Sequence, residues 1–172
     1  MMLNDRYTMK VDIILYETIK SSGIDLILSL PCILLKGLLE EIDKRHEIQN
    51  IPITREEEGV GIAAGAYLGG KVPAILMQNS GLGNSVNAIK SLLQLYRIPV
   101  IFVMSHRGDE GEKILAQIPM GKLTPSLLDL LNIKKFIINS LEDIKNINRA
   151  VDLSIKTKNS VGILLKRNLW RK

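Results

Sequence analysis

The sequence has few of the residues from which metal centres and disulfides are built. It contains one cysteine, Cys32, and two histidines, His46 and His106, which lie far apart in the chain. A single cysteine excludes an internal disulfide, and the spacing of these three residues matches no zinc motif. We therefore expect this chain to carry no metal site of its own.

Long apolar runs and aromatic residues are also scarce. Polar and charged residues interrupt the N-terminal segment at residues 4–12, so it resembles neither a signal peptide nor a membrane span. Aromatic residues make up 4% of the chain, and the basic residues behind its net charge of +5 are scattered or near the C-terminus, which disfavours nucleic-acid binding. We expect a cytoplasmic protein that binds neither nucleic acid nor membrane, and whose positive charge suits an anionic small molecule.

The sequence does contain a regular alternation of two patterns. With 172 residues, 46% of them hydrophobic, and no repeat or linker, we expect a single domain over residues 1–172. Amphipathic helical patterns occupy residues 8–22, 34–45, 57–68, 83–95, 126–131 and 141–156. Short apolar runs lie between them, at residues 26–30, 48–53, 74–77, 100–104, 136–138 and 161–165. Because such runs are typical of strands covered on both faces, the alternation predicts a doubly wound α/β fold with about six parallel strands and helices on both faces.

Polar and flexible residues gather where the predicted strands give way to helices. Such turns follow four strands, at residues 31–32, 54–57, 78–84 and 105–108. Open α/β sheets bind ligands outside the carboxyl ends of their strands. The topology alone therefore predicts a binding site at this edge.

Three consecutive glutamates, Glu56, Glu57 and Glu58, stand at the second of these turns and open a helix rich in small residues. Acidic residues in a first helical turn interact favourably with the helix dipole, which by itself accounts for Glu57 and Glu58 as an alternative to a functional role. Glu56 lies at the strand-to-helix junction. We expect its carboxylate to face the crevice, where it can hydrogen-bond a ligand nitrogen.

The glycine-rich turn at residues 78–84 allows the backbone to approach a ligand closely. It contains no Gly-Lys-Ser/Thr sequence, and Val86 stands where a dinucleotide fingerprint has its third glycine, so a nucleotide-phosphate site is disfavoured. An ordinary tight turn is the alternative interpretation.

A long connection follows the fourth predicted strand and begins with His106 and Arg107. It continues through Lys113, Gln117, a predicted turn at residues 119–121, and Lys122. Connections of this length are often functional, and a solvated polar loop is the alternative for each of these residues. Cys32 has no paired base in the sequence and is expected to be a packing residue.

Together these segments resemble the thiamine-diphosphate-dependent 2-oxo acid decarboxylases. Residues 54–68 are similar to the segment in which a cofactor-binding Glu opens a small-residue helix, and in that family a Gly lies nine positions after the Glu. Gly65 stands nine positions after Glu56, which selects Glu56 over its neighbours. Residues 77–87, 105–108 and 117–121 extend the likeness over nearly the whole chain. It is closest to the sulfopyruvate decarboxylase alpha subunits and to the phosphonopyruvate decarboxylases.

The resemblance implies that Glu56 hydrogen-bonds the aminopyrimidine ring nitrogen of thiamine diphosphate and favours its imino tautomer. The cofactor-binding residues that it implies are Glu56, Asn79, Ser80, Gly81, Leu82 and Gly83.

For the anionic substrate we expect binding by His106, Arg107 and Gln117. Lys113 and Lys122 are further candidate donors for its sulfonate, farther along the loop. Arg107 is the first choice because it leaves the end of a rigid strand and its guanidinium suits a sulfonate. The alternative is that Arg107 only pairs with Asp109 or Glu110 on the surface, and that a partner subunit supplies the anion site.

The family's magnesium-binding Gly-Asp-Gly sequence is absent from this chain. Its one Gly-Asp pair, Gly108-Asp109, continues into Glu110. The resemblance therefore implies a split enzyme: this chain is the pyrimidine-binding domain, and a beta subunit carries the domain that holds the cofactor's diphosphate through Mg²⁺. A histidine that precedes the Glu in many relatives is replaced by Arg55, so no histidine role is carried over to that position.

The implied reaction converts 3-sulfopyruvate to sulfoacetaldehyde and carbon dioxide, as in coenzyme M biosynthesis, in a hetero-oligomer. Phosphonopyruvate is the alternative substrate, because its phosphonate has a similar shape. A second class of function also stays open, a non-catalytic α/β module whose strand-end loops hold a small anion, since a fold does not fix a function.

Overall fold

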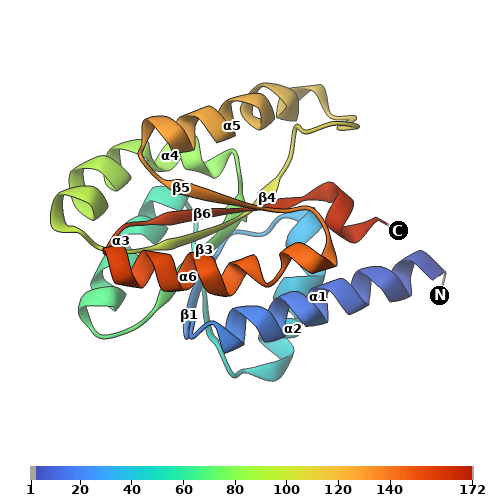
Figure 1. Ribbon diagram of the computed structural model, residues 1–172, viewed down its shortest axis with the longest axis horizontal. Helices are drawn as coiled ribbons and strands as arrows, with labels where there is room; N and C mark the ends of the chain where they lie inside the picture. Colours follow the sequence, from blue (N-terminus) through green and yellow to red (C-terminus); the bar gives the residue numbers. More distant parts are fainter. Residues whose placement is uncertain (1–2, 172) are drawn as a thin grey trace.

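A single parallel sheet of six strands forms the centre of the computed structural model, which describes residues 3–171 (Figure 1). The strands run in the order β2-β1-β3-β4-β6-β5. Their bounds are β1 Leu26–Ser29, β2 Gln49–Pro52, β3 Pro73–Gln78, β4 Ile101–His106, β5 Lys134–Ile138 and β6 Val161–Lys166. All neighbouring strands pair in parallel, so the predicted doubly wound α/β class is confirmed.

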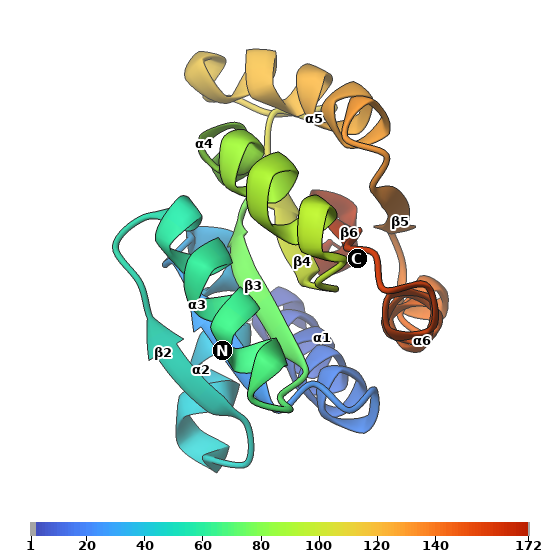
Figure 2. The same ribbon diagram turned by 90° about the vertical axis from the view of Figure 1, so that its left-hand side faces the viewer.

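Helices cover both faces of the sheet. They are α1 Leu3–Ser21, α2 Lys36–Arg45, α3 Glu56–Leu68, α4 Gly81–Ala88, α5 Ile118–Leu130 and α6 Asn146–Thr157. Short helical turns add η1 Ile33–Leu35, η2 Ile89–Gln94, η3 Leu115–Gln117, η4 Leu141–Asp143 and η5 Arg167–Trp170. Helices α4 and α5 lie on one side of the strands, and α1 and α6 lie on the other (Figures 1 and 2).

The alternation of side chains along a strand divides the core into two layers. On β4, Ile101 and Val103 pack into the layer under α1, α2 and α6, whereas Phe102 and Met104 pack into the layer under α3, α4 and α5. All four side chains are fully buried, as expected for a central strand of a parallel sheet. The residues that end this strand, Ser105 and His106, therefore also face opposite layers.

Helix α5 begins at Ile118, eight residues before the predicted start at residue 126, so the predicted turn at residues 119–121 is wrong. Two prolines hid the helix in the sequence. Pro119 lies in the first turn, where the backbone N–H that proline lacks has no intrahelical partner anyway. Pro125 lies in the interior, where a proline normally breaks the pattern because the carbonyl four residues earlier loses its donor.

The last residues of the chain are tied to the first helix. The Trp170 indole Nε1–H donates to Asp12 Oδ1 at 2.8 Å, and both residues are buried. Burial raises the pKa of Asp12 to about 6, against the lowering effect of the Trp170 hydrogen bond. None of the helices in residues 3–171 has the length and apolarity that a membrane crossing needs.

Candidate functional site

The strand order creates a crevice at the carboxyl edge of the sheet. From β1 the chain passes to β2 on one side, and β3 then returns to the other side of β1. Loops that leave β1 and β3 therefore diverge, and ligands bind at such switch points in open α/β sheets. The start of α3, the start of α4 and the connection from β4 to α5 surround this point.

The three consecutive glutamates have three different environments. Glu58 accepts hydrogen bonds from the Thr54 backbone N–H at 3.0 Å and from its hydroxyl at 2.8 Å, and these bonds lower the pKa of Glu58. Glu57 pairs with Arg55 at 2.8 Å. Both residues are thus engaged with the start of their own helix, which is the simpler of the two roles considered for them.

Glu56 points across to α4. Its side chain lies directly on Gly81, because a Cβ atom at position 81 would come within 2.3 Å of Glu56 Cγ. The Asn84 side chain donates from Nδ2 to Glu56 Oε2 at 2.9 Å. Figure 2 shows α3 and α4 as neighbouring helices, in agreement with their contacts.

Gly65, which fixes the register of Glu56, lies on the exposed side of α3. A Cβ atom there would meet nothing within 4 Å, and the same holds for Gly61, one turn earlier. Within residues 3–171, therefore, no neighbouring element requires these two glycines. At the end of the same helix, Leu68 is 76% exposed.

The polar side chain of Asn79 is used inside the protein. It accepts from the Arg107 backbone N–H at 2.9 Å and donates to the Thr124 hydroxyl at 2.9 Å. Leu82 is fully buried in the core, and the Ser80 hydroxyl accepts from Gln78 at 2.7 Å. Of the loop predicted to bind the cofactor, Gly81 therefore presents its backbone to Glu56, whereas a Cβ atom at Gly83 would meet Met120 Cε at 3.5 Å.

Histidine 106 contacts α5 one turn before Pro125. His106 Nε2 lies 2.9 Å from the Gly121 carbonyl oxygen. That carbonyl is the one left without an intrahelical donor by Pro125, so His106 supplies the missing hydrogen bond. Burial lowers the pKa of His106 and keeps the ring neutral. With the proton on Nε2, the buried Nδ1 is left as an acceptor, and it has no partner in the part of the chain that the structure describes. The prediction that His106 binds the substrate stays a prediction.

Arginine 107 forms a buried ion pair. Its Nε and Nη2 contact the two oxygens of Glu112 at 2.7 and 3.0 Å, and the two side chains are 9% and 2% exposed. This pairing raises the pKa of Arg107 and lowers that of Glu112. The prediction that Asp109 or Glu110 pairs with Arg107 is wrong. Arg107 pairs with Glu112, and Asp109 pairs with Lys166 at 2.6 Å. The Glu112 carboxylate also accepts hydrogen bonds from the backbone N–H groups of residues 108, 113 and 114. These bonds stabilise the conformation of the loop.

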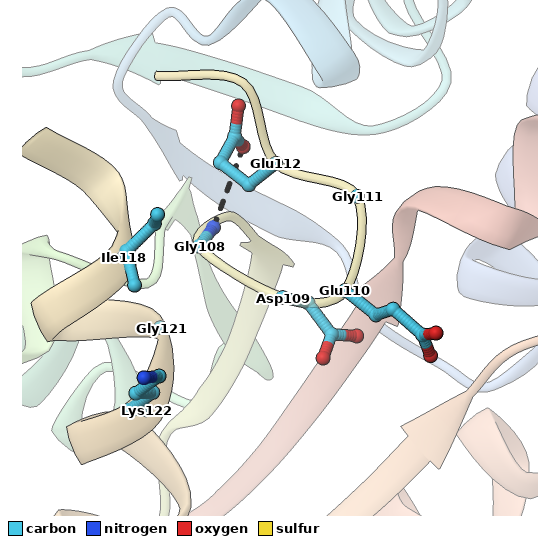
Figure 3. Close-up of a pocket in the computed structure, with 8 residues that line it drawn as sticks. All are labelled: Gly108, Asp109, Glu110, Gly111, Glu112, Ile118, Gly121 and Lys122. Carbon is cyan, nitrogen blue, oxygen red and sulfur yellow. Dashed lines mark hydrogen bonds between the residues drawn. The ribbon is translucent and has the colours of Figure 1, made fainter. Parts of the chain in front are cut away.

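A pocket of about 340 Å³ lies between this loop and α5 (Figure 3). Its lining residues are Gly108, Asp109, Glu110, Gly111, Glu112, Ile118, Gly121 and Lys122. Three carboxylates and one ammonium group make it a poor site for an anion. Two of these lining residues, Gly108 and Gly121, lie so close together that a Cβ atom at position 121 would be 2.3 Å from the Gly108 carbonyl carbon.

Gln117 is brought to the crevice by a hydrogen-bond chain that sequence reasoning missed. Gln78 Nε2, at the end of β3, donates to Gln117 Oε1 at 2.8 Å. Cys32 lies 3.8 Å from Gln78 Oε1 and 3.2 Å from the Ser105 hydroxyl, which agrees with the expected packing role. Residues from β3, β4, η3 and the turn after β1 thus meet at the switch point.

Sequence reasoning also passed over Asn84 and Glu112. The only available signal for Asn84 was its position three residues after Gly81, on the same side of a helix. Across residues 3–171, no group of three or more His, Cys, Asp or Glu side chains is arranged to hold a metal ion.

Comparison with known proteins adds to this geometry. Residues 9–132 match the family model described as thiamine pyrophosphate enzyme, N-terminal TPP binding domain. The chain is 49% identical over 156 residues to the sulfopyruvate decarboxylase subunit alpha of Methanococcus maripaludis, covering 90% of this chain and 93% of that protein. It is 38% identical to the sulfopyruvate decarboxylase of Methanosarcina acetivorans, covering 90% of this chain but 39% of that protein.

Among solved structures, the fold is similar to that of a 2-oxoglutarate:ferredoxin oxidoreductase from Magnetococcus marinus. The TM-score is 0.69 at 13% identity, and the match covers 93% of this chain and 29% of the other. At this identity the likeness concerns the fold alone.

Proposed function

The chain belongs to the thiamine pyrophosphate enzymes, within the family of sulfopyruvate decarboxylase alpha subunits, and from this premise we propose that it decarboxylates 3-sulfopyruvate to sulfoacetaldehyde together with a second subunit. The observation that carries the proposal is the Glu56 carboxylate lying on Gly81 at the switch point of the sheet. The cytoplasmic location expected from the sequence stays a prediction.

The residues at the crevice suit the aminopyrimidine half of thiamine diphosphate. The absence of a side chain at Gly81 lets the Glu56 side chain lie against the backbone at the start of α4, and this places its carboxylate at the crevice. One oxygen of that carboxylate is bound by Asn84, and the other has no hydrogen-bond partner within residues 3–171. A ring nitrogen that must receive or share a proton needs a carboxyl group that can give up the proton and take it back.

When bound, thiamine diphosphate supplies the nucleophilic carbon that attacks a 2-oxo acid and accepts the electrons released with carbon dioxide. The part of this chain is to hold a proton between Glu56 and the pyrimidine ring. The ring would lie against the backbone around Gly81 and Gly83. The neighbouring residues Asn79, Ser80 and Leu82 hold this backbone in place. The small residues keep this backbone close to the carboxylate.

The proposed substrate contacts lie on the β4 side of the crevice. Glu112 occupies Nε and Nη2 of Arg107, so Nη1 is the guanidinium nitrogen that remains for a sulfonate oxygen. Gln117 reaches the same crevice through Gln78. His106 contributes by fixing α5 and thereby the position of Gln117.

A second subunit completes the site in this proposal. The single-chain relative from Methanosarcina acetivorans is matched over 39% of its length, so most of that protein has no counterpart in this chain. Three large apolar side chains are exposed beside the strand ends: Ile33, Ile114 and Leu115. We propose that the partner covers them, supplies the Mg²⁺ ligands for the diphosphate and closes a water-poor cavity.

Reconstitution tests the proposal. The chain should be mixed with the beta subunit, thiamine diphosphate and Mg²⁺, and the carbon dioxide formed from 3-sulfopyruvate, phosphonopyruvate and pyruvate should be measured. We expect turnover only with all components, and the highest kcat/KM for 3-sulfopyruvate. Turnover by this chain alone would contradict the split enzyme, and higher efficiency with phosphonopyruvate would overturn the substrate. No turnover with any partner would support the non-catalytic anion-binding module.

A further inference from the structure

Helix α4 presents two residues of one face to Glu56. Gly81 and Asn84 are three positions apart, so their Cα atoms lie on the same side of the helix. Gly81 leaves the room that the Glu56 side chain occupies, and Asn84 donates to the Oε2 atom at its end. The position of the Glu56 carboxylate is thus set by its packing against the Gly81 backbone and by the hydrogen bond from Asn84.

We infer that Asn84 is a positioning residue that directs the exchangeable proton of Glu56 to Oε1; this rests on the proposed function of Glu56. A hydrogen bond from a neutral amide occupies a lone pair of Oε2 and favours the ionised carboxylate. Oε2 is therefore the poorer site for a proton. Oε1 lies against Gly81 and has no hydrogen-bond partner in the part of the chain that the structure describes, so it is the oxygen that can accept a proton and hand it on.

Nothing charged on the facing helix competes with this arrangement. Helix α4 contains no charged residue, so Asn84 is its strongest donor toward Glu56. On the side of α3, Arg55 is paired with Glu57, and Glu58 is bound by Thr54. The neutral amide holds the carboxylate without neutralising it, as a cationic side chain at position 84 would do.

The inference predicts a change in proton transfer when Asn84 is replaced. In the reconstituted enzyme, Asn84→Ala should lower kcat about 10-fold, the loss expected when one hydrogen bond to a charged group is removed. The acidic limb of the pH–rate profile should move to higher pH, because the ionised carboxylate has lost a donor. Asn84→Asp, which has the same shape but adds a like charge, should move that limb further in the same direction.

A second readout does not depend on turnover. The tautomer of the bound aminopyrimidine can be followed by circular dichroism as a function of pH, without substrate. We expect the pH midpoint of the tautomer change to move in both Asn84 variants, and further in Asn84→Asp than in Asn84→Ala. Asn87→Ala, the same change one turn along the exposed side of α4, is the matched control and should leave the profile, the tautomer midpoint and the melting temperature unchanged.

The outcomes separate this inference from the function on which it rests. If Asn84→Ala and Asn84→Asp lower kcat but keep the wild-type pH profile and tautomer midpoint, Asn84 is merely structural and the inference is overturned. If Glu56→Gln turns over normally, the role of Glu56 itself is wrong. A lowered melting temperature for Asn84→Ala with an unshifted tautomer midpoint would also count against the inference, since the residue is exposed and its one side-chain hydrogen bond within residues 3–171 is with Glu56.

Discussion

The two halves of the strand-end edge use glycine in opposite ways. Between α3 and α4, Gly81 leaves room for a side chain, and Glu56 occupies that room with one oxygen still without a partner. Between β4 and α5, glycine brings backbone against backbone, and a Cβ atom at Gly108 would lie 1.9 Å from the Gln117 carbonyl oxygen. The first contact can yield by moving a side chain, whereas the second cannot yield without moving a helix.

The halves also differ in how their polar groups are satisfied. On the β4 side, Asn79, Arg107 and Glu112 are buried and bonded to one another or to the backbone. On the α3 side, the Glu56 carboxylate is held by a single neutral amide. A group that exchanges protons needs an atom that is still free to form a hydrogen bond. Residues that only support the structure do not. The comparison therefore separates a site for chemistry from the frame that supports it.

The largest expected effect is on the α3 side. Glu56→Gln should lower kcat of the reconstituted enzyme about 100- to 10,000-fold, the usual contribution of a proton-transferring side chain, because an amide of the same size cannot exchange the proton. Assembly with the partner, measured by size-exclusion chromatography, should be unchanged. Glu57→Gln is the control and should be far milder. The reverse result, a dead Glu57→Gln and an active Glu56→Gln, would show that the register is off by one residue.

On the β4 side, the expected effect is on stability. Arg107→Ala removes the bidentate partner of Glu112 and leaves this carboxylate with Arg167 at 3.7 Å, so it should lower the free energy of unfolding by about 1.5–3 kcal/mol, the range for hydrogen bonds to a charged group. Because the folded-state pKa of Glu112 is lowered, the pair stabilises the protein above the unfolded pKa near 4.5, and this stabilisation is lost as the pH falls below it. Urea unfolding at several pH values should therefore show a loss for Arg107→Ala at pH 7 that shrinks in acid.

Arg107→Lys keeps the charge and separates the two roles of this residue. If Nη1 binds the sulfonate, the lysine variant should lose more kcat/KM with 3-sulfopyruvate than with pyruvate, since an ammonium cannot bind Glu112 and a sulfonate in the same way. Equal losses with both substrates would leave Arg107 with a structural role only.

The smallest effects test the two glycine contacts directly. Gly121→Ala places a methyl group against the Gly108 backbone and should destabilise the fold by about 1–3 kcal/mol. The nearest atoms to the methyl group of Gly81→Ala belong to the Glu56 side chain, which can rotate away, so the melting temperature should stay close to wild type while decarboxylation falls. Similar losses of stability for both variants would remove the distinction between a yielding contact and a rigid one.

Much of the fold could be predicted because the helical and strand patterns of apolar residues indicate which side chains are buried. Six apolar runs became six strands, and Glu56 was selected by the position of Gly65. Helix α5 was underestimated because Pro119 is tolerated through its place in the first helical turn and Pro125 through a contact distant in sequence. The ion pair of Arg107 with Glu112 could not be predicted either. Three carboxylates lie within five residues of Arg107, and the path of the loop decides which one reaches the guanidinium.

The bond between His106 and the Gly121 carbonyl has a consequence for how this family can vary. Pro125 removes the donor that a normal helix would give to that carbonyl, and His106 replaces it from the end of β4. A relative with an ordinary residue at position 125 satisfies the carbonyl within the helix and no longer requires a histidine at position 106. We therefore expect positions 106 and 125, which are nineteen residues apart in the sequence, to covary among homologues.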